Sequence, residues 1–269
     1  MLIATNTIGL ENRSRSDDRR CHASIMVDKL FTDFRLAAWY DRLHPWDARS
    51  DFEFYLPMVL AAESVLDVGC GTGALLHRAR ESGHVGRLCG LDPAPGMLEV
   101  ARARDDIEWV LGDASAARGQ FDLVVMTGHA FQVLVEDDEL RAALAAIAAT
   151  LTATGRFVFE TRNPLVREWE TWDRRYSGEV TDETGAVVRS VCEVAEPVRG
   201  DLVSFTHTFT SAGWEPEVSH STLRFLGTGA LSAFLSEAGL VVAEQFGNWD
   251  RTPLTDASPE IITSARRSG

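Results

Sequence analysis

Short apolar runs alternate with amphipathic segments along residues 64–160, and this pattern predicts alternating strands and helices. The runs are nearly continuous in apolar residues, which suits strands that are buried on both faces. We expect strands over 65–68, 88–92, 107–111, 121–126 and 156–160. Helical spacing predicts intervening helices over 74–82, 95–103 and 138–151. Such alternation is typical of a parallel sheet covered by helices on both faces.

The pattern changes after the fifth of these strands. Turn signals and β-rich runs over 186–194 and 202–210 predict antiparallel strands, and we interpret residues 165–220 as a cap inserted over the mouth of a site. The later elements are expected to be a helix over 231–238 and strands over 240–246 and 261–265. The predicted fold class is therefore α/β: a Rossmann-like, doubly wound, mostly parallel sheet with a closing antiparallel strand and an antiparallel β cap insertion.

The beginning of the chain divides near residue 26. Residues 1–25 include a charged stretch over 12–20 without apolar periodicity, so we expect a disordered arm. The acids in this stretch and the missing apolar core argue against a targeting peptide. Helical spacing then follows over 30–40 and 52–62. We expect one domain over 26–269 that carries the embedded cap.

Composition narrows the classes of function. The 269 residues are 45% hydrophobic, as is ordinary for a globular protein. The 40 acidic and 26 basic residues give a net charge of −14, which argues against a nucleic-acid partner because such binding neutralises phosphates. No run approaches the ~20 apolar residues that cross a bilayer, so we expect no membrane partner. The four cysteines show neither paired nor metal-ligand spacing, which favours a cytoplasmic protein without a metal.

Polar residues gather where the predicted strands end. They are Asp67, Asp92, Asp113, Thr127 and Glu160. In open parallel sheets ligands bind beyond the carboxyl ends of the strands. Five polar residues at one edge are hard to explain by packing, so we expect the active site there.

The first strand runs into a glycine turn, Gly69-Cys70-Gly71-Thr72-Gly73. Glycine has no Cβ, so the backbone can turn sharply here and approach a ligand closely. Asp67 places a carboxylate beside that ligand, which suits a cationic amino-acid group better than a phosphate. The spacing also satisfies the dinucleotide fingerprint, with Asp92 19 residues past Gly73. Asp67 speaks against that alternative, because a pyrophosphate prefers backbone N–H groups alone.

This stretch resembles motif I of the class I S-adenosylmethionine (SAM) dependent methyltransferases. Gly-Leu-Asp92-Pro-Ala-Pro-Gly-Met97-Leu is similar to the second family motif, whose acid takes the ribose hydroxyls and whose apolar residue packs on adenine. Gly112-Asp113-Ala114 resembles the element that receives the adenine amino group. The resemblance implies SAM as cofactor, with S-adenosylhomocysteine as product. The cofactor-binding residues that it implies are Tyr40, Trp46, Asp67, Gly69, Cys70, Gly71, Gly73, Asp92, Pro93, Met97, Gly112, Asp113, Ala114 and Thr127.

A second resemblance concerns the acceptor. Thr127-Gly128-His129 resembles a segment of bacterial amino-sugar N-methyltransferases in which the histidine faces the substrate amine. Trp39-Tyr40-Asp41 is similar to the tyrosine segment that lies over the SAM methionine there and in glycine N-methyltransferases. The resemblance implies His129 and Tyr40 as catalytic residues. Glu160 and Arg162 follow as substrate contacts.

The chemistry requires the acceptor to lose or lack a proton, and a histidine that titrates near pH 7 suits that task. We therefore expect methyl transfer to a nitrogen or oxygen of a small molecule. The alternatives are a SAM-binding fold used for a non-methylating step in natural-product biosynthesis, an NAD-dependent oxidoreductase and a binding module. The acceptor and the oligomeric state, a homodimer included, stay open.

Overall fold

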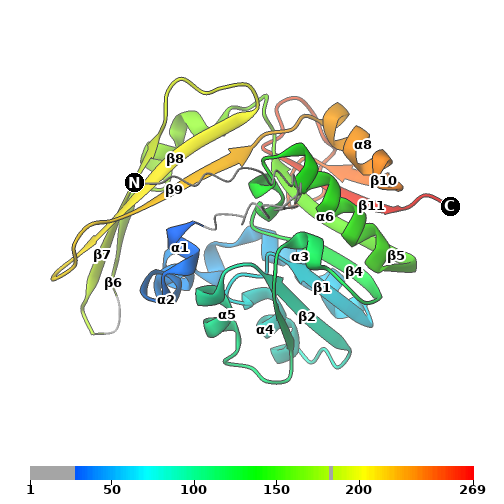
Figure 1. Cartoon of the computed structure of the whole chain (residues 1–269), viewed down its shortest axis with the longest axis horizontal. Coiled ribbons are helices and arrows are strands. Elements are labelled where there is room, and N and C mark those ends of the chain that lie inside the picture. Colours follow the sequence, from blue (N-terminus) through cyan, green and yellow to red (C-terminus); the bar gives the residue numbers. More distant parts are fainter. Residues whose placement is uncertain (1–27, 182–183) are drawn as a thin grey trace, which may run out of the picture.

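The computed structural model describes residues 28–181 and 184–269. The strands of these residues form two separate sheets (Figure 1). The expected arm over residues 1–25 lies outside the described residues. The larger sheet has the order β10-β11-β5-β4-β1-β2-β3. Its strands are β1 (Ser64–Val68), β2 (Arg87–Asp92), β3 (Glu108–Leu111), β4 (Phe121–Met126), β5 (Leu151–Arg162), β10 (Leu240–Phe246) and β11 (Glu260–Arg267).

The direction of the strands confirms the predicted fold class. Neighbouring strands from β3 to β5 pair in parallel. β11 pairs antiparallel with both β5 and β10, so it alone opposes the common direction. The amino end of β11 therefore lies at the same edge as the carboxyl ends of the parallel strands.

Helices cover both faces of this sheet. Successive side chains of a strand point to opposite faces, so both faces of the sheet carry apolar residues that helices bury. Val65 and Val125 point toward α3 (Ser50–Ala61) and α4 (Ala74–Glu81). Leu66 and Val124 point to the other face, toward α6 (Asp137–Thr150) and α8 (Thr228–Glu237). α5 (Pro95–Ala101) packs near β2 and β3. None of the helices in the described part of the chain is long and apolar enough to cross a membrane.

The helix expected over 30–40 is instead broken in two, α1 (Lys29–Thr32) and α2 (Phe34–Leu43). The break lies at Asp33, whose carboxylate accepts the backbone N–H groups of Arg35 and Leu36 and so caps α2. We call residues 29–43 the lid. Short helical turns complete the structure: η1 (Trp46–Ala48), η2 (Ala114–Ala116), η3 (Ala130–Val133), η4 (Glu168–Thr171) and α7 (Trp172–Arg175).

The smaller sheet forms the cap, and the lid packs against it (Figure 1). Its antiparallel strands are β6 (Gly178–Thr181), β7 (Val187–Val194), β8 (Leu202–Ser211) and β9 (Glu217–Arg224). The sequence pattern predicts β7 and β8 but neither of the outer two strands, and the predicted cap ends at residue 220, short of the end of β9 at Arg224. The reason is visible in β9, where the apolar residues Val218 and Leu223 point to opposite faces and give no alternation.

Candidate active site

The carboxyl edge of the large sheet brings together most of the predicted polar residues. Asp67 and Asp92 are buried at the ends of β1 and β2, and Thr127 is buried after β4. Asp113 is half-buried and caps η2 by accepting the N–H of Ser115 at 2.8 Å. Pro93, Gly112 and Ala114 lie in the turns beside these acids. The expected gathering at one edge is what the structure has.

The three glycines of the turn serve different purposes, although all have positive φ. A Cβ on Gly69 would lie 2.8 Å from that of Ala130, and one on Gly73 would lie 2.4 Å from the Trp109 ring. These two positions are therefore restricted by packing. A Cβ on Gly71 would meet nothing within 4 Å, so open space lies over this residue. Gly71 is where a ligand can approach the backbone.

The surroundings of the Asp67 carboxyl group suit a positively charged ligand. Its side chain is 1% exposed, and within the described residues its Oδ1 has no hydrogen-bond partner. Burial and the nearby charge of Asp92 raise the pKa of Asp67 to about 8. An unpaired buried carboxyl group is costly unless a partner satisfies it. A cationic ligand above the turn would supply that partner.

Asp92 is held by the turn itself. Its Oδ2 accepts the N–H of Gly71 and its Oδ1 the N–H of Ala94, each at 2.8 Å. Burial raises its pKa. Each carboxylate oxygen can accept a second hydrogen bond, so a diol can still bind.

Three predicted cofactor residues lie in other surroundings. Met97 is 1% exposed and packs among Ala37, Ala94 and Tyr40, so in this structure it belongs to the core between lid and α5. Cys70 packs in the core against Trp109. The Trp46 ring packs tilted against Phe52, at 4.5 Å between ring centroids, and does not line the cavity described next.

A cavity of about 520 Å³ lies between the lid, the cap and the carboxyl edge. It is lined by aromatic side chains and by several charged ones. Among them are Phe31, Tyr40, Arg49, Asp51, His129, Arg162, Trp172, Tyr176, Phe205, His207, Phe209, Trp249 and Glu260. The lid, which also packs on α5, brings Tyr40 here, and burial raises the pKa of its hydroxyl. The site is thus shared by segments far apart in the chain.

His129 occupies the wall of this cavity in a left-handed conformation, with φ 62°. Its N–H donates to Oε1 of Glu160 at 2.7 Å, and its Nε2 lies 3.0 Å from Oε2 of Glu260. Burial, with a smaller effect from Arg162, lowers the pKa of His129 to about 3. The expectation of a histidine that by itself titrates near pH 7 is therefore wrong for this residue.

Glu160 was expected to contact substrate, but the structure places it beneath His129. It is fully buried, and its two oxygens accept hydrogen bonds from His129 N–H and from the Tyr55 hydroxyl. Burial raises its pKa to about 7. Glu160 supports the wall instead of forming its surface.

Glu260 is a cavity residue that sequence reasoning missed. It begins β11, pairs in register with Arg162 of β5 and is 8% exposed. Burial raises its pKa to about 8. The predicted polar residues lie at the carboxyl ends of parallel strands, whereas β11 is antiparallel and reaches the same edge with its first residue. An acid directly before the apolar run Ile261-Ile262 was the available signal.

The arginines of the cavity already have acidic partners. Arg49 lies 2.6 Å from Asp51, and Arg162 lies 3.1 Å from Glu168. Arg162 also donates to Oε1 of Gln132 at 3.0 Å. These ion pairs hold the two guanidinium groups in place and reduce the net positive charge that faces the cavity.

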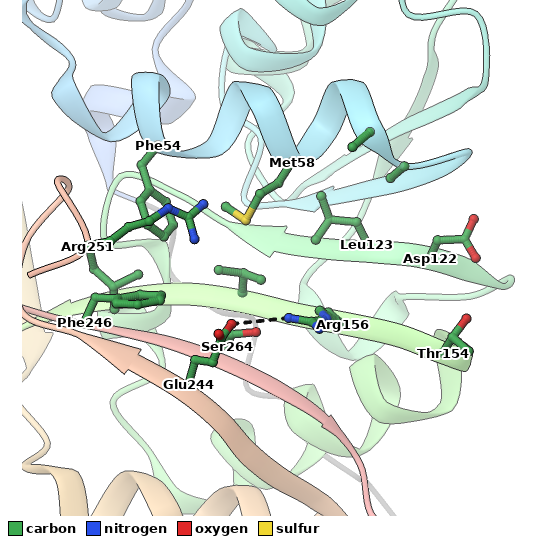
Figure 2. A pocket seen from close by; sticks show the side chains of 14 residues that line it. Phe54, Met58, Asp122, Leu123, Thr154, Arg156, Glu244, Phe246, Arg251 and Ser264 are labelled. Atoms are coloured by element: carbon green, nitrogen blue, oxygen red, sulfur yellow. Dashed lines mark hydrogen bonds and ion pairs between the residues drawn. The ribbon is translucent and has the colours of Figure 1, made fainter. Parts of the chain in front are cut away.

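A second cavity, of about 390 Å³, lies between α3 and the strands β4, β5, β11 and β10 (Figure 2). Phe54 and Arg251 stand at one end, and Asp122 and Thr154 stand near the amino ends of β4 and β5 (Figure 2). Its lining contains no predicted site residue. This cavity is separate from the acidic edge.

Comparison with known proteins agrees with the site. A methyltransferase domain model matches residues 65–155. A glycine/sarcosine N-methyltransferase from Parasynechococcus marenigrum is 30% identical over 79% of this chain and 76% of its own length. A cypemycin N-terminal methyltransferase from Streptomyces is 31% identical over 86% of this chain and 89% of its own length.

Among solved structures, SAM-bound CalS10, an amino pentose methyltransferase from Micromonospora echinaspora, superposes with a TM-score of 0.64. The two chains are 24% identical, and the match covers 86% of this chain and 95% of CalS10, so the likeness supports the fold alone. These relationships favour methyl transfer to a nitrogen or oxygen of a small molecule over the dinucleotide alternative. The chain belongs to the SAM-dependent methyltransferases.

Proposed function

We propose that the protein methylates an amine of a small molecule, which binds in the cavity between lid, cap and sheet edge. The observation that carries this proposal is the pairing of charges in the cavity. Asp51 and Glu179 are matched by arginines. Glu260 instead faces the imidazole of His129, so an acceptor ammonium is the cation that suits it.

Asp67, Gly71 and Asp92 are proposed to hold SAM. When bound, SAM supplies a methyl group activated by its sulfonium. The unpartnered Oδ1 of Asp67 fits the α-ammonium group, and the open space over Gly71 admits the ligand. Asp92 fits the ribose diol, and Asp113 fits the adenine amino group. Thr127 and Tyr40 form the boundary between this site and the cavity.

The chain's own contribution is then mostly placement. Holding two reactants in line supplies a large share of the rate of such a transfer. The aromatic walls exclude water, while His129 and Arg162 contact the acceptor. His129 is proposed as the residue nearest to the reacting nitrogen, since its main chain is fixed by Glu160.

The two relatives described above, each matched over more than three quarters of this chain, are named a glycine/sarcosine N-methyltransferase and an N-terminal methyltransferase. That supports nitrogen over oxygen as the acceptor atom. The net charge of −14 supports an acceptor other than nucleic acid. The free Cys70, Cys89 and Cys192 support a reducing compartment such as the cytoplasm. A homodimer remains a proposal to be tested by mass in solution.

The test is a paired measurement. Calorimetry should show binding of SAM and S-adenosylhomocysteine but not NAD. Release of S-adenosylhomocysteine should then be followed with matched acceptors that differ only in amine, hydroxyl or carboxyl. Turnover of the amines supports the proposal. Turnover confined to hydroxyl acceptors would make the protein an O-methyltransferase and overturn the proposed acceptor class.

A further inference from the structure

Glu260 and His129 form a hydrogen-bonded pair at one end of the cavity. Glu260 comes from β11 and His129 from the segment after β4, 131 positions apart in the chain. Both side chains are largely enclosed, with 11% and 18% exposed. Both also line the cavity. The pair is therefore placed to act on whatever binds there.

The imidazole of His129 has one nitrogen left for the acceptor. Glu260 engages Nε2 at 3.0 Å, and Glu160 fixes the backbone N–H. Nδ1 has no hydrogen bond to any residue that the structure describes. Because the side chain is partly exposed in the cavity wall, Nδ1 is the atom that can meet an acceptor.

We propose that Glu260 is a positioning residue whose carboxylate holds the Nε2–H of His129, so that the lone pair of Nδ1 accepts the proton that an acceptor ammonium loses. The inference rests on the proposed function, because it requires an amine. The ammonium N–H bond breaks and leaves its electron pair on nitrogen. That pair forms the bond to the methyl carbon, whose bond to sulfur breaks with its electrons staying on sulfur. The proton ends on Nδ1, beside the carboxylate of Glu260.

The electrostatics of the site explain why the pair is needed. A histidine whose pKa burial lowers to about 3 is a weak base for an ammonium. Burial raises the pKa of Glu260 to about 8. The two groups share a hydrogen bond and therefore titrate as a unit. A proton delivered to Nδ1 gives an ion pair with the same proton count as neutral His129 beside protonated Glu260. Because burial raises the pKa of Glu260, the unit takes up a proton at a higher pH than His129 alone would, closer to the range of amines.

Several other charges act on the pair. They are Glu160 and Arg162 from β5, Asp51 and Tyr55 from α3, Glu168 from η4, Arg175 from α7, and Arg49, which lies beside Gly128. Arg162 and Arg175 favour the carboxylate form of Glu260, whereas Glu168 and Asp51 favour its protonated form. The effects oppose each other, and burial sets the direction.

The direct test is nitrogen NMR of the imidazole in the protein alone, from about pH 6 to about pH 10. His129 is assigned by the signals lost in His129→Asn. We expect protonated Nε2 and unprotonated Nδ1 above about pH 8, and proton uptake by the pair as the pH falls through that value. In Glu260→Gln the uptake by His129 should move to lower pH. A protonated Nδ1 with a bare Nε2 at high pH, or an unchanged titration in Glu260→Gln, would overturn the inference.

The kinetic test uses an amine acceptor. Glu260→Gln should lower kcat/KM at least tenfold above about pH 8 and remove the limb that rises through about pH 8. The affinity for SAM should not change. Glu244→Gln is the matched control, because Glu244 lies on neighbouring β10 and pairs with Arg156 at 3.3 Å beside the second cavity (Figure 2). It should leave both the rate and the limb unchanged. An equal loss in both variants would count against a positioning role.

The two proposals can fail separately. The expected tautomer without turnover of any amine would refute the proposed function. Amine turnover with the opposite tautomer would refute the role of Glu260. If Glu260→Gln lowers the melting temperature too far for assay, the spectra of the unaltered protein still decide the tautomer.

Discussion

The carboxyl edge of the parallel sheet and the cap form opposite walls of one site, yet they are built differently. At the edge, main-chain geometry sets the chemistry, as Gly71 with its positive φ and Asp92 with its backbone hydrogen bonds show. In the cap, Phe205, His207 and Phe209 alternate along β8 and face the cavity with their side chains. Side chains on a regular strand can change without altering the backbone. The wall proposed to hold the cofactor is thus fixed by its backbone, whereas the wall proposed to face the acceptor is adaptable.

The lid connects these two walls. On one side the Thr72 hydroxyl of the glycine turn donates to Asp41 at 2.6 Å. On the other side the N–H of Leu30 donates to the hydroxyl of Ser219 in β9 at 3.1 Å, and Leu36 packs in the same cluster as Phe209. A ligand bound at either wall would therefore act on the same two helices, α1 and α2.

The largest effect should come from removing the adaptable wall. Replacement of residues 178–223 by a short Gly/Ser link should abolish acceptor turnover, because Phe205, His207 and Phe209, which line the cavity from the cap, are lost. The two sheets share no strand, so SAM affinity should fall less than tenfold, the remaining loss coming from a looser lid. Turnover and calorimetry measure the two quantities. Loss of SAM binding together with turnover would show that the cap belongs to the cofactor wall.

Gly71→Val tests the fixed wall. The new side chain would occupy the open space over the turn, so SAM affinity should fall about a hundredfold or more by calorimetry. Valine is also strained at φ 56°, which makes a strain control necessary. Gly213→Val in the turn between β8 and β9 provides it, with φ 79° and likewise nothing within 4 Å. Equal losses of SAM affinity in both variants would point to strain and not to a ligand site.

His129→Asn tests where the two walls meet. Asparagine keeps a small polar group that tolerates positive φ, so the fold should persist. We expect turnover to fall at least tenfold with little change in SAM affinity or melting temperature, since removal of a general base typically costs ~10²–10⁴ in rate. His220→Asn on the exposed side of β9 is the control. A fall in stability that matches the fall in activity would assign His129 to the fold.

The smallest effect is on stability. The folded pKa of Asp67, about 8, exceeds its unfolded value near 3.8, so the folded state binds the extra proton between these values. Stability of the ligand-free protein therefore falls as the pH rises from about 4 to about 8 and levels off above. Asp67→Asn removes this loss. Its melting temperature should exceed that of the unaltered protein by a few degrees at pH 8 and by less at pH 5, while SAM affinity falls.

The quantity to compare is the melting temperature of Asp67→Asn minus that of the unaltered protein. A smaller difference at pH 8 than at pH 5 would contradict this account. About 1 kcal/mol shifts the midpoint by about 2–4 °C in chains approaching this length. Asp122→Asn is a suitable control, because Asp122 lies at the amino end of β4 and already accepts hydrogen bonds from Ser64 and Thr152.

The sequence by itself determined the parallel sheet, the glycine turn and the acids at the ends of β1 and β2. These features are local: each depends on a strand and the few residues after it, and their apolar runs and glycines are legible in the chain. The two central strands of the cap were legible for the same reason. The SAM-dependent family followed from that turn and those acids.

Tertiary structure alone decided which side chains line the cavity. Met97 reads as a cofactor contact in its motif, yet the lid folds over it and makes it core. Glu160 is predicted to end a strand, yet β5 continues to Arg162, and Tyr55 and His129 enclose the Glu160 side chain. Glu260 meets His129 only because β11 reverses direction and pairs with β5 in one register. Such contacts depend on long-range pairing and burial, which no local pattern of residues encodes.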